Sequence, residues 1–232
     1  MNEFLGRKKE LAFLEEKYKS KNAEFVIIYG RRRIGKTETI SHFCKNKNAV
    51  FFTCTQTDNK SQLKNFSEKI LSFNLPQSKY ITEFSSWEHA FLALKEISAA
   101  NEEKKIVVID EFPYMAKEYA EIPSVLQKVW DTELKKENIL LILCGSSMSY
   151  IEKEILSEKN PLYGRATGIY KMLPMSFSDS SLFFPNWNKK DKIIAHAILG
   201  GIPYYFSLFN PKKKLKENIC SNILKKGSII NV

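Results

Sequence analysis

The sequence lacks any apolar run long enough to cross a membrane, and it contains few glycines and prolines. Its longest continuous apolar stretch, Ile139 to Cys144, has the length of a buried strand, whereas a membrane-spanning helix needs about 18 residues or more. Only 9 Gly and 8 Pro occur among 232 residues, so no low-complexity linker dominates. The 44% apolar and 27% charged residues are typical of a folded globular protein and exclude a disordered chain, a collagen-like fibre and a coiled coil.

Cysteine and histidine are too scattered for a disulfide or zinc framework. The four cysteines form no Cys-x-x-Cys pair, and two of them lie inside apolar stretches. We interpret them as reduced thiols of a cytoplasmic protein. The three histidines show no metal-ligand spacing, so we expect no zinc site. Because no apolar run is long enough to span a bilayer, we also expect no membrane partner.

Acidic residues are fewer than basic residues in this sequence. Lys and Arg total 36 against 26 Asp and Glu, a net charge of +10 that attracts polyanions. A basic stretch near the C-terminal end is a candidate DNA contact, although such a stretch is more often a solvated helix face. Its lysines are Lys212, Lys213, Lys214, Lys216, Lys225 and Lys226.

Short apolar stretches alternate with helical periodicity over the first two thirds of the chain. The apolar stretches predict buried strands over 25–29, 49–54, 105–110 and 139–144. The spacing between them predicts helices over 7–19, 36–46, 60–73, 87–100 and 122–136. The predicted fold class is therefore α/β, with a parallel sheet and helices on both faces.

The pattern changes near residue 170, where aromatic residues and prolines become frequent. From residue 189 the sequence predicts short helices, interrupted at Gly200-Gly201-Ile202-Pro203. We therefore predict an α/β core over 1–172 and a small helical segment over 173–232. The last residues carry no terminating signal, so we expect this segment to open a C-terminal region that is truncated here.

The clearest chemical signature is Gly30-Arg31-Arg32-Arg33-Ile34-Gly35-Lys36-Thr37, which fits G-x-x-x-x-G-K-[ST]. It follows a predicted strand and opens a predicted helix, where backbone N–H groups face a bound anion. Lys36 would neutralise the β- and γ-phosphates, and Thr37 would ligate Mg²⁺. The predicted nucleotide-binding residues of this loop are Gly30, Arg31, Arg32, Arg33, Ile34, Gly35, Lys36, Thr37 and Glu38.

Two further strand ends carry polar side chains. The strand over 105–110 ends in Asp110 and Glu111, where the first carboxylate would support Mg²⁺ and the second would activate a water molecule. The strand over 139–144 leads into Gly145, Ser146 and Ser147. Ser146 is the preferred candidate for sensing the γ-phosphate or orienting the water, against the alternative of an ordinary Gly-Ser turn.

Together these motifs resemble the archaeal-type P-loop ATPase family, relatives of the AAA+ and STAND ATPases. The resemblance implies an additional-strand P-loop NTPase followed by a helical lid. The stretches that carry it are Phe4-Leu5-Gly6-Arg7-Lys8-Lys9-Glu10-Leu11, Tyr29-Gly30-Arg31-Arg32-Arg33-Ile34-Gly35-Lys36-Thr37, Asp110-Glu111-Phe112-Pro113-Tyr114, Leu162-Tyr163-Gly164-Arg165 and Gly200-Gly201-Ile202-Pro203-Tyr204-Tyr205.

The resemblance also implies roles that the residues alone do not. Gly6 and Arg7 would lie beside the adenine base, and Pro203 would belong to a lid over the nucleotide. Arg165 would approach the γ-phosphate, either in cis or from a neighbouring copy in a homo-oligomer. Family members usually continue into a C-terminal effector domain, often nuclease-like, which this sequence does not contain.

These observations favour an ATPase that binds Mg²⁺ and ATP, releases ADP and acts as a switch for a partner domain. Two alternatives stay open: a nucleotide-stabilised module that binds DNA or protein with little turnover, and a small-molecule P-loop kinase. No acceptor site for a kinase substrate stands out. No N-K-x-D motif for guanine appears, so the resemblance favours ATP over GTP.

Overall fold

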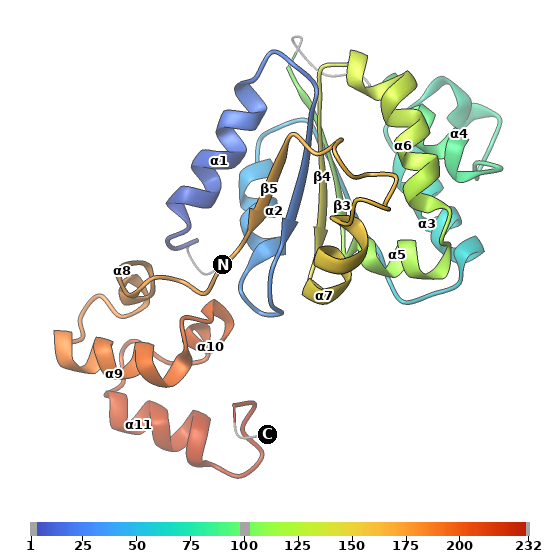
Figure 1. Cartoon of the computed structure of the whole chain (residues 1–232). Helices are drawn as coiled ribbons and strands as arrows, with labels where there is room; N and C mark the ends of the chain where they lie inside the picture. The colour runs from blue at the N-terminus through green and yellow to red at the C-terminus, as the bar shows by residue number, and fades with distance from the viewer. Residues whose placement is uncertain (1–3, 98–102, 231–232) are drawn as a thin grey trace.

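The computed structural model describes residues 4–97 and 103–230, and five parallel strands form its centre (Figure 1). They are β1 (Glu24–Tyr29), β2 (Ala49–Thr53), β3 (Lys105–Asp110), β4 (Ile139–Gly145) and β5 (Gly168–Lys171). Their order in the sheet is β2-β3-β4-β1-β5. Strand β4 therefore lies between β1 and β3, and the predicted α/β class with its interposed strand is confirmed.

The strands form because their apolar runs bury side chains on both faces of the sheet. Every residue of β1, β3 and β4 is buried, as expected of a parallel sheet covered on both sides. Successive side chains point to opposite faces. In β1, Phe25 and Ile27 pack into one core cluster, whereas Val26 and Ile28 pack into the other.

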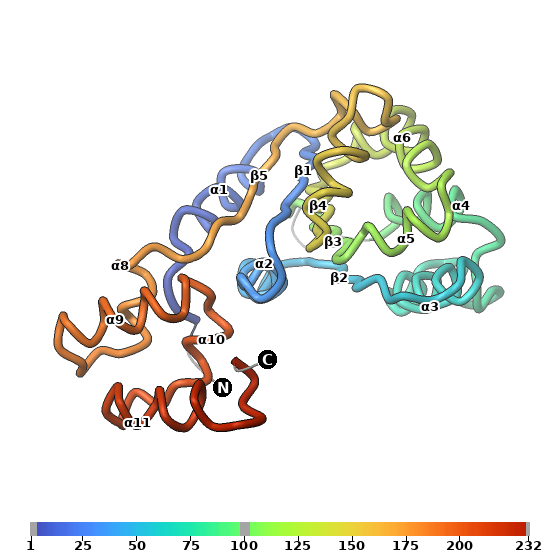
Figure 2. Tube along the Cα trace, turned by 60° about the horizontal axis from the view of Figure 1, so that its bottom comes forward, coloured from blue at the N-terminus to red at the C-terminus, as the bar shows by residue number. Residues whose placement is uncertain are grey.

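Helices cover the two faces unequally (Figures 1 and 2). One face carries α1 (Lys8–Lys19) and α2 (Lys36–Cys44). The other carries a larger layer made of α3 (Asn59–Leu71), α4 (Trp87–Leu92), α5 (Phe112–Glu118) and α6 (Ile122–Thr132). In the described part of the chain, no helix is both long enough and apolar enough to cross a bilayer.

Several element boundaries differ from those predicted. The sequence did not predict α5 or β5, because seven and four residues are too short to show a periodicity. Helix α4 ends at Leu92 and continues as a 3₁₀ turn over Ala93–Glu96, and the predicted positions 98–100 lie outside the described residues. Helix α6 likewise ends at Thr132, before a 3₁₀ turn over Leu134–Lys136.

The chain after β5 forms a helical segment beside the carboxyl end of the sheet (Figure 1). Its helices are α8 (Phe177–Ser180), α9 (Lys189–Leu199), α10 (Pro203–Ser207) and α11 (Leu215–Ile219). They surround a small apolar cluster of their own, made of Phe184, Ala195, Leu199, Phe206, Phe209 and Leu215. The short helix α7 (Met148–Tyr150) follows β4 and stays with the sheet.

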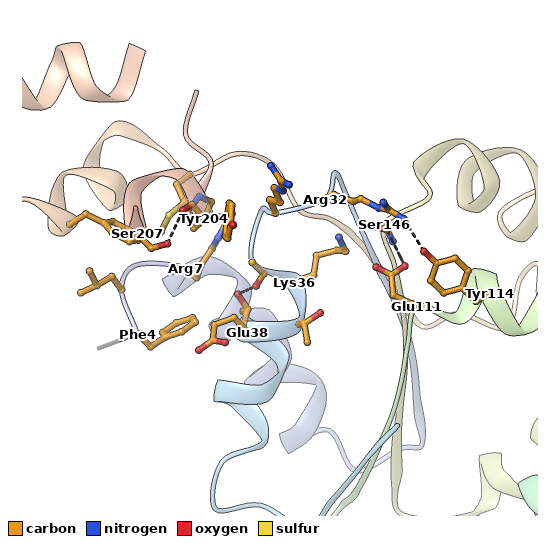
Figure 3. Close-up of a pocket in the computed structure, with 18 residues that line it drawn as sticks. Phe4, Arg7, Arg32, Lys36, Glu38, Glu111, Tyr114, Ser146, Tyr204 and Ser207 are labelled. Atoms are coloured by element: carbon orange, nitrogen blue, oxygen red, sulfur yellow. Dashed lines mark hydrogen bonds between the residues drawn. The ribbon is translucent and has the colours of Figure 1, made fainter. Parts of the chain in front are cut away.

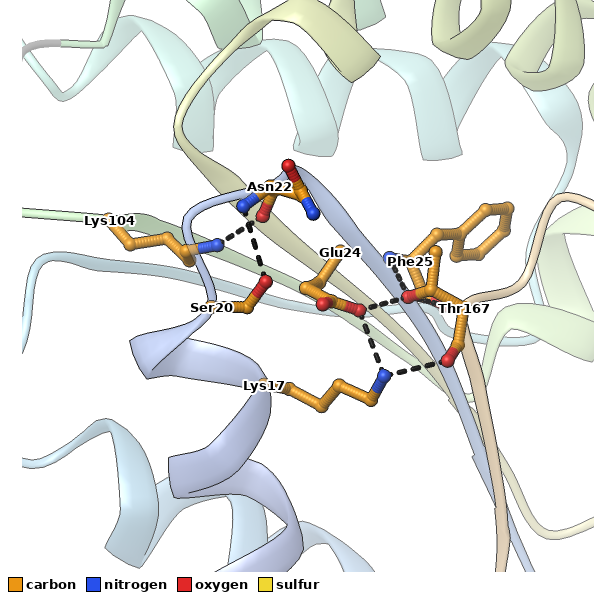
Figure 4. Close-up of polar contacts among 7 residues, drawn as sticks. All are labelled: Lys17, Ser20, Asn22, Glu24, Phe25, Lys104 and Thr167. Carbon is orange, nitrogen blue, oxygen red and sulfur yellow. Dashed lines mark hydrogen bonds and ion pairs between the residues drawn. The ribbon is translucent and has the colours of Figure 1, made fainter.

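A polar network joins α1, β1 and the start of β5 at the opposite, amino end of the sheet (Figure 4). Lys17 donates to Glu24 Oε2 at 3.0 Å and to the Thr167 carbonyl at 2.7 Å. The Thr167 hydroxyl also contacts Glu24 and accepts a bond from the Phe25 N–H. Burial opposes ionisation of Glu24, but bonds from Thr167, Ser20 and Lys17 lower its pKa below the ordinary value.

Candidate functional site: a cavity at the carboxyl end of the sheet

The loop between β1 and α2 wraps tightly because glycine occupies its first position. A Cβ atom on Gly30 would lie 2.4 Å from the Met172 carbonyl oxygen and 2.5 Å from Ile34 Cδ1. Ile34 is fully buried beneath the loop and anchors it to the core. Gly35 has a left-handed φ of 86° and caps α2, which leaves the first N–H groups of that helix facing outward.

Lys36 lies at the mouth of this loop and is only 5% exposed. Its ammonium group donates to the carbonyl oxygens of Gly30 at 2.9 Å and Arg31 at 3.1 Å. These bonds hold a positive charge among the loop's backbone groups. A phosphate oxygen offers the same ammonium group a stronger, charge-assisted hydrogen bond.

The loop over 30–37, called the phosphate loop from here on, meets the tip of β3 directly. Thr37 Oγ1 donates to Asp110 Oδ2 at 2.7 Å, and the other carboxylate oxygen of Asp110 accepts from the Glu111 N–H at 3.0 Å. Asp110 is 1% exposed. The hydroxyl and the carboxylate that the sequence predicted as metal ligands are therefore neighbours, although they lie 73 positions apart in the chain.

The neighbouring acid, Glu111, is held by the tip of β4. Its Oε2 accepts two bonds from Ser146, one from the backbone N–H and one from the hydroxyl, both at 3.0 Å. Glu111 has a left-handed φ of 52° and caps α5. Helix α5 packs closely against the end of β4 because residue 145 is glycine. A Cβ atom on Gly145 would lie 2.7 Å from Pro113 Cδ.

These groups line one end of a cavity of about 600 Å³ (Figure 3). Its polar lining at the phosphate loop and the strand ends includes Arg32, Lys36, Thr37, Glu111 and Ser146, and Glu38 lies beside Phe4 (Figure 3). Its apolar lining is formed by Phe4, Leu5, Met175, Phe183, Pro203 and Tyr204. The cavity can therefore take a polyanion together with a flat apolar group.

Arg7 joins three segments at the wall of this cavity and is 4% exposed. Its guanidinium group donates to the carbonyls of Ile34 at 2.6 Å and Leu173 at 2.8 Å, and it forms an ion pair with Glu10 at 2.7 Å. Its neighbour Gly6 does not line the cavity. A Cβ atom there would lie 2.7 Å from Met175 Cε, so Gly6 allows close packing of the wall.

Not every predicted residue lies at the cavity surface. Gly30, Arg31 and Ile34 form the loop without lining the cavity, and Asp110 lies behind Thr37. Arg165 also lies outside the lining, where its guanidinium group bonds Asp131 Oδ2 at 3.1 and 3.3 Å and the Tyr163 carbonyl at 3.1 Å. Its approach to the γ-phosphate, in cis or from a neighbouring copy, stays a prediction.

Sequence reasoning gave no role to the tyrosines around the loop arginines. The Tyr114 hydroxyl accepts a bond from Arg32 at 2.8 Å. Arg33 lies over the Tyr204 ring, 4.9 Å from its centroid, and donates to the Tyr205 hydroxyl at 3.3 Å. All three tyrosines occur in the motifs that carry the family resemblance. Their place in those motifs was the sequence signal that could have pointed to a role at the site.

The cysteines remain thiols with no chemistry at this site. All four are free, and Cys54 and Cys144 are buried. Burial, together with the nearby Asp110 carboxylate, raises the pKa of Cys144 well above its ordinary value. Burial also raises the pKa of Cys44, to about 12. These two groups stay protonated and unreactive near neutral pH.

Comparison with known proteins agrees with this geometry. Residues 4–209 match a family described as the ATPase domain predominantly from Archaea. The chain belongs to this family. Over 202 residues it is 37% identical to the uncharacterized protein MJECL04 of Methanocaldococcus jannaschii. The aligned region covers 87% of this chain and 43% of that protein. The chain therefore spans less than half the length of that relative.

Solved structures share the fold of this ATPase-family domain. The Walker-type ATPase PABY2304 of Pyrococcus abyssi superposes with a TM-score of 0.67 at 22% identity, covering 89% of this chain and 66% of that one. The ORC2 protein of Aeropyrum pernix superposes with a TM-score of 0.61 at 14% identity, covering 89% and 61%. At such identities the likeness concerns the fold, which is that of a P-loop ATPase.

Proposed function

We propose that this ATPase domain binds Mg-ATP in the cavity, hydrolyses it and thereby acts as a nucleotide-driven switch for a partner domain. The observation that carries the proposal is the junction at the carboxyl end of the sheet. There Thr37 bonds Asp110 at 2.7 Å, and Ser146 bonds Glu111 at 3.0 Å. The phosphate loop, a metal-binding carboxylate and a second carboxylate thus adjoin one cavity.

The polar and the apolar parts of the cavity lining fit the triphosphate and the base of ATP. The triphosphate would take the N–H groups at the start of α2 and the ammonium group of Lys36, whose present partners are neutral carbonyls. The base would lie against the apolar end, near Phe4, Leu5 and Pro203. Arg7 would keep that wall in place through its bonds to Ile34 and Leu173.

The residues present fit Mg²⁺. The hydroxyl of Thr37 and the carboxylate of Asp110 are hard oxygen donors 2.7 Å apart, and Mg²⁺ commonly takes one or two protein ligands with substrate phosphates and water. Residues 4–97 and 103–230 hold no cluster of three or more His, Cys, Asp or Glu side chains suited to a metal, which agrees with a site completed by phosphate. When bound, the ion would offset phosphate charge during transfer.

Hydrolysis would use Glu111 as the general base. A carboxylate at this place can take the proton of a water molecule that attacks the γ-phosphorus in line. The two bonds from Ser146 fix the direction of the Glu111 carboxylate, so Ser146 would act by positioning the base.

A switch role is favoured by contacts between the phosphate loop and the helical segment. Arg33 reaches Tyr204 and Tyr205 on α10, and a Cβ atom on Gly35 of the same loop would lie 3.7 Å from Pro203 Cγ at the start of α10. A loop that moves with the nucleotide would therefore move α10. We propose residues 1–172 as the catalytic core and 173–232 as the lid that reports nucleotide state.

Partner contacts are the least constrained part of the proposal. Arg165 would act on a neighbouring copy, since it is bound to Asp131 outside its own cavity. A second candidate function, DNA binding with little turnover, is favoured by one observation. Near α11, six exposed lysines have side chains without a hydrogen-bond or ion-pair partner among the described residues, and these are Lys212, Lys213, Lys214, Lys216, Lys225 and Lys226.

The proposed function is tested by titrating the chain with ATP and Mg²⁺ and then measuring phosphate release. Lys36→Ala should weaken ATP binding at least ~100-fold, because it removes the charge that faces the phosphates. The matched control is Lys45→Ala, which removes an exposed charge beyond the far end of α2. Equal ATP affinity in the two variants would contradict the assignment. Tight ATP binding with no phosphate release would favour the binding module.

A further inference from the structure

The three consecutive arginines of the phosphate loop point in different directions. Arg33 has a left-handed φ of 67°, which turns the chain so that its side chain faces α10, whereas Arg32 faces α5. Arg31 makes no side-chain hydrogen bond or ion pair with any described residue and does not line the cavity. Only Arg32 therefore lies at the end of the cavity that holds Glu111 (Figure 3).

We propose that Arg32 is a catalytic residue that leaves the Tyr114 hydroxyl and binds the γ-phosphate oxygens of ATP within the same chain. The proposal rests on the proposed function, since it assigns the residue that neutralises the transferring phosphoryl group. Arg32, Glu111, Tyr114 and Ser146 all line the same cavity. Arg32 is exposed, so its side chain has room to change partner.

The position of Tyr114 is set by the same backbone that sets Glu111. The Tyr114 N–H donates to the Glu111 carbonyl at 2.9 Å, in the first turn of α5. The tyrosine is thus one turn beyond the proposed base. While it is bonded to Tyr114, the Arg32 guanidinium group therefore lies on the same side of the cavity as the proposed base (Figure 3).

The exchange of partners is favoured by charge. The Tyr114 hydroxyl is a neutral acceptor, whereas a terminal phosphate is anionic, and charge-assisted hydrogen bonds are roughly twice as strong as neutral ones. The planar guanidinium group matches two phosphate oxygens at once. ADP has no γ-phosphate, so it should leave Arg32 on Tyr114. Arg32 would thereby distinguish ATP from ADP.

During hydrolysis the water oxygen forms the new bond to the γ-phosphorus. The bond from phosphorus to the β–γ bridging oxygen breaks, and its electron pair stays on ADP. Glu111 takes the water proton and returns it to solvent as inorganic phosphate leaves. Arg32 holds the equatorial oxygens throughout, where negative charge is spread in the transition state.

The test compares Arg32→Ala, Arg32→Lys and the charge-loss control Lys45→Ala. Phosphate release gives kcat, and titration in a Glu111→Gln background gives ATP and ADP affinities. Arg32→Ala should lower kcat by ~100-fold or more and weaken ATP binding by ~10-fold, with ADP binding unchanged. Arg32→Lys should recover part of both losses, because it restores the charge but not the fork. Lys45→Ala should match the unsubstituted chain.

Tyr114→Phe separates this role from a structural one. Loss of the resting partner should raise ATP affinity by about 2- to 10-fold, the value of one hydrogen bond, and leave ADP affinity unchanged. The matched control is Tyr80→Phe, since Tyr80 is 86% exposed. An unchanged kcat in Arg32→Ala, with normal ATP binding, would overturn this proposal alone. Absence of ATP binding by the unsubstituted chain would overturn it together with the proposed function.

Discussion

Replacing Arg7 should destabilise the whole cavity wall, because one guanidinium group joins three segments. The variant Arg7→Met removes its bonds to the carbonyls of Ile34 and Leu173 and the ion pair with Glu10. Arg7 is 4% exposed and the Glu10 side chain 12% exposed. The substitution therefore strands a nearly buried carboxylate and two carbonyl groups.

The size of the effect follows from that burial. Breaking a buried ion pair by removing one partner costs about 3–5 kcal/mol. Arg7 Nε is itself buried without a partner, and that existing cost places the expected loss near the lower limit, at about 3 kcal/mol. For a chain of this size, ~3 kcal/mol lowers the melting temperature by roughly 6–12 °C.

Urea unfolding of Arg7→Met against Lys9→Met measures this difference directly. Lys9 is exposed on the same helix, α1, so its loss should change the free energy of unfolding by no more than about 0.5 kcal/mol. The double variant with Glu10→Gln should recover part of the loss, because no carboxylate is then stranded. Equal stability of Arg7→Met and Lys9→Met would refute the reasoning.

Three further predictions concern the site and the sheet. Ser146→Ala should lower kcat by ~10-fold or more while ATP affinity stays within ~2-fold, since the hydroxyl orients the base; Ser147→Ala, one position on, should have no such effect. Asp110→Asn should weaken Mg²⁺-dependent ATP binding, and EDTA should then change affinity less than in the unsubstituted chain. Glu24 has a lowered pKa when folded, so its contribution to stability is present above its unfolded pKa and is lost as pH falls through the folded pKa. Glu24→Gln should therefore flatten the acid side of the stability profile, and an unchanged profile would contradict the network in Figure 4.

The sheet and the polar end of the site were predictable because their signals are local. Strand β1, the glycine-bounded loop and Lys36 adjoin in the sequence, and the parallel order of strands brings Asp110 to the same edge. Ser146 follows from the same rule, since β4 lies between β1 and β3. Residues at the ends of neighbouring parallel strands meet whatever their separation in the chain.

The apolar end of the site could not be predicted in this way. Phe4, Met175, Phe183 and Tyr204 line the cavity from the two ends of the chain, and their meeting depends on how the helical segment packs beside the sheet. No periodicity or motif spacing encodes that packing. The resemblance gave Gly6 and Arg7 a place near the base without revealing that Arg7 bonds Ile34 and Leu173.

The directions of the three loop arginines could not be predicted from the sequence either. The sequence places equal charges at 31, 32 and 33, and the left-handed backbone at Arg33 turns that side chain toward α10, whereas Arg32 faces α5. The place of Arg165 was likewise unpredictable, because its guanidinium group is held outside the cavity by Asp131 on α6, which is distant in the sequence. Backbone conformation and tertiary partners decide both cases.

The central claim is that the carboxylate beside the phosphate loop activates water on bound ATP. Phosphate release by Glu111→Gln at saturating Mg-ATP tests it most directly. The account predicts at least a ~100-fold lower kcat, with ATP still bound as tightly as by the unsubstituted chain. Release at the unsubstituted rate by a fully loaded Glu111→Gln protein would contradict it.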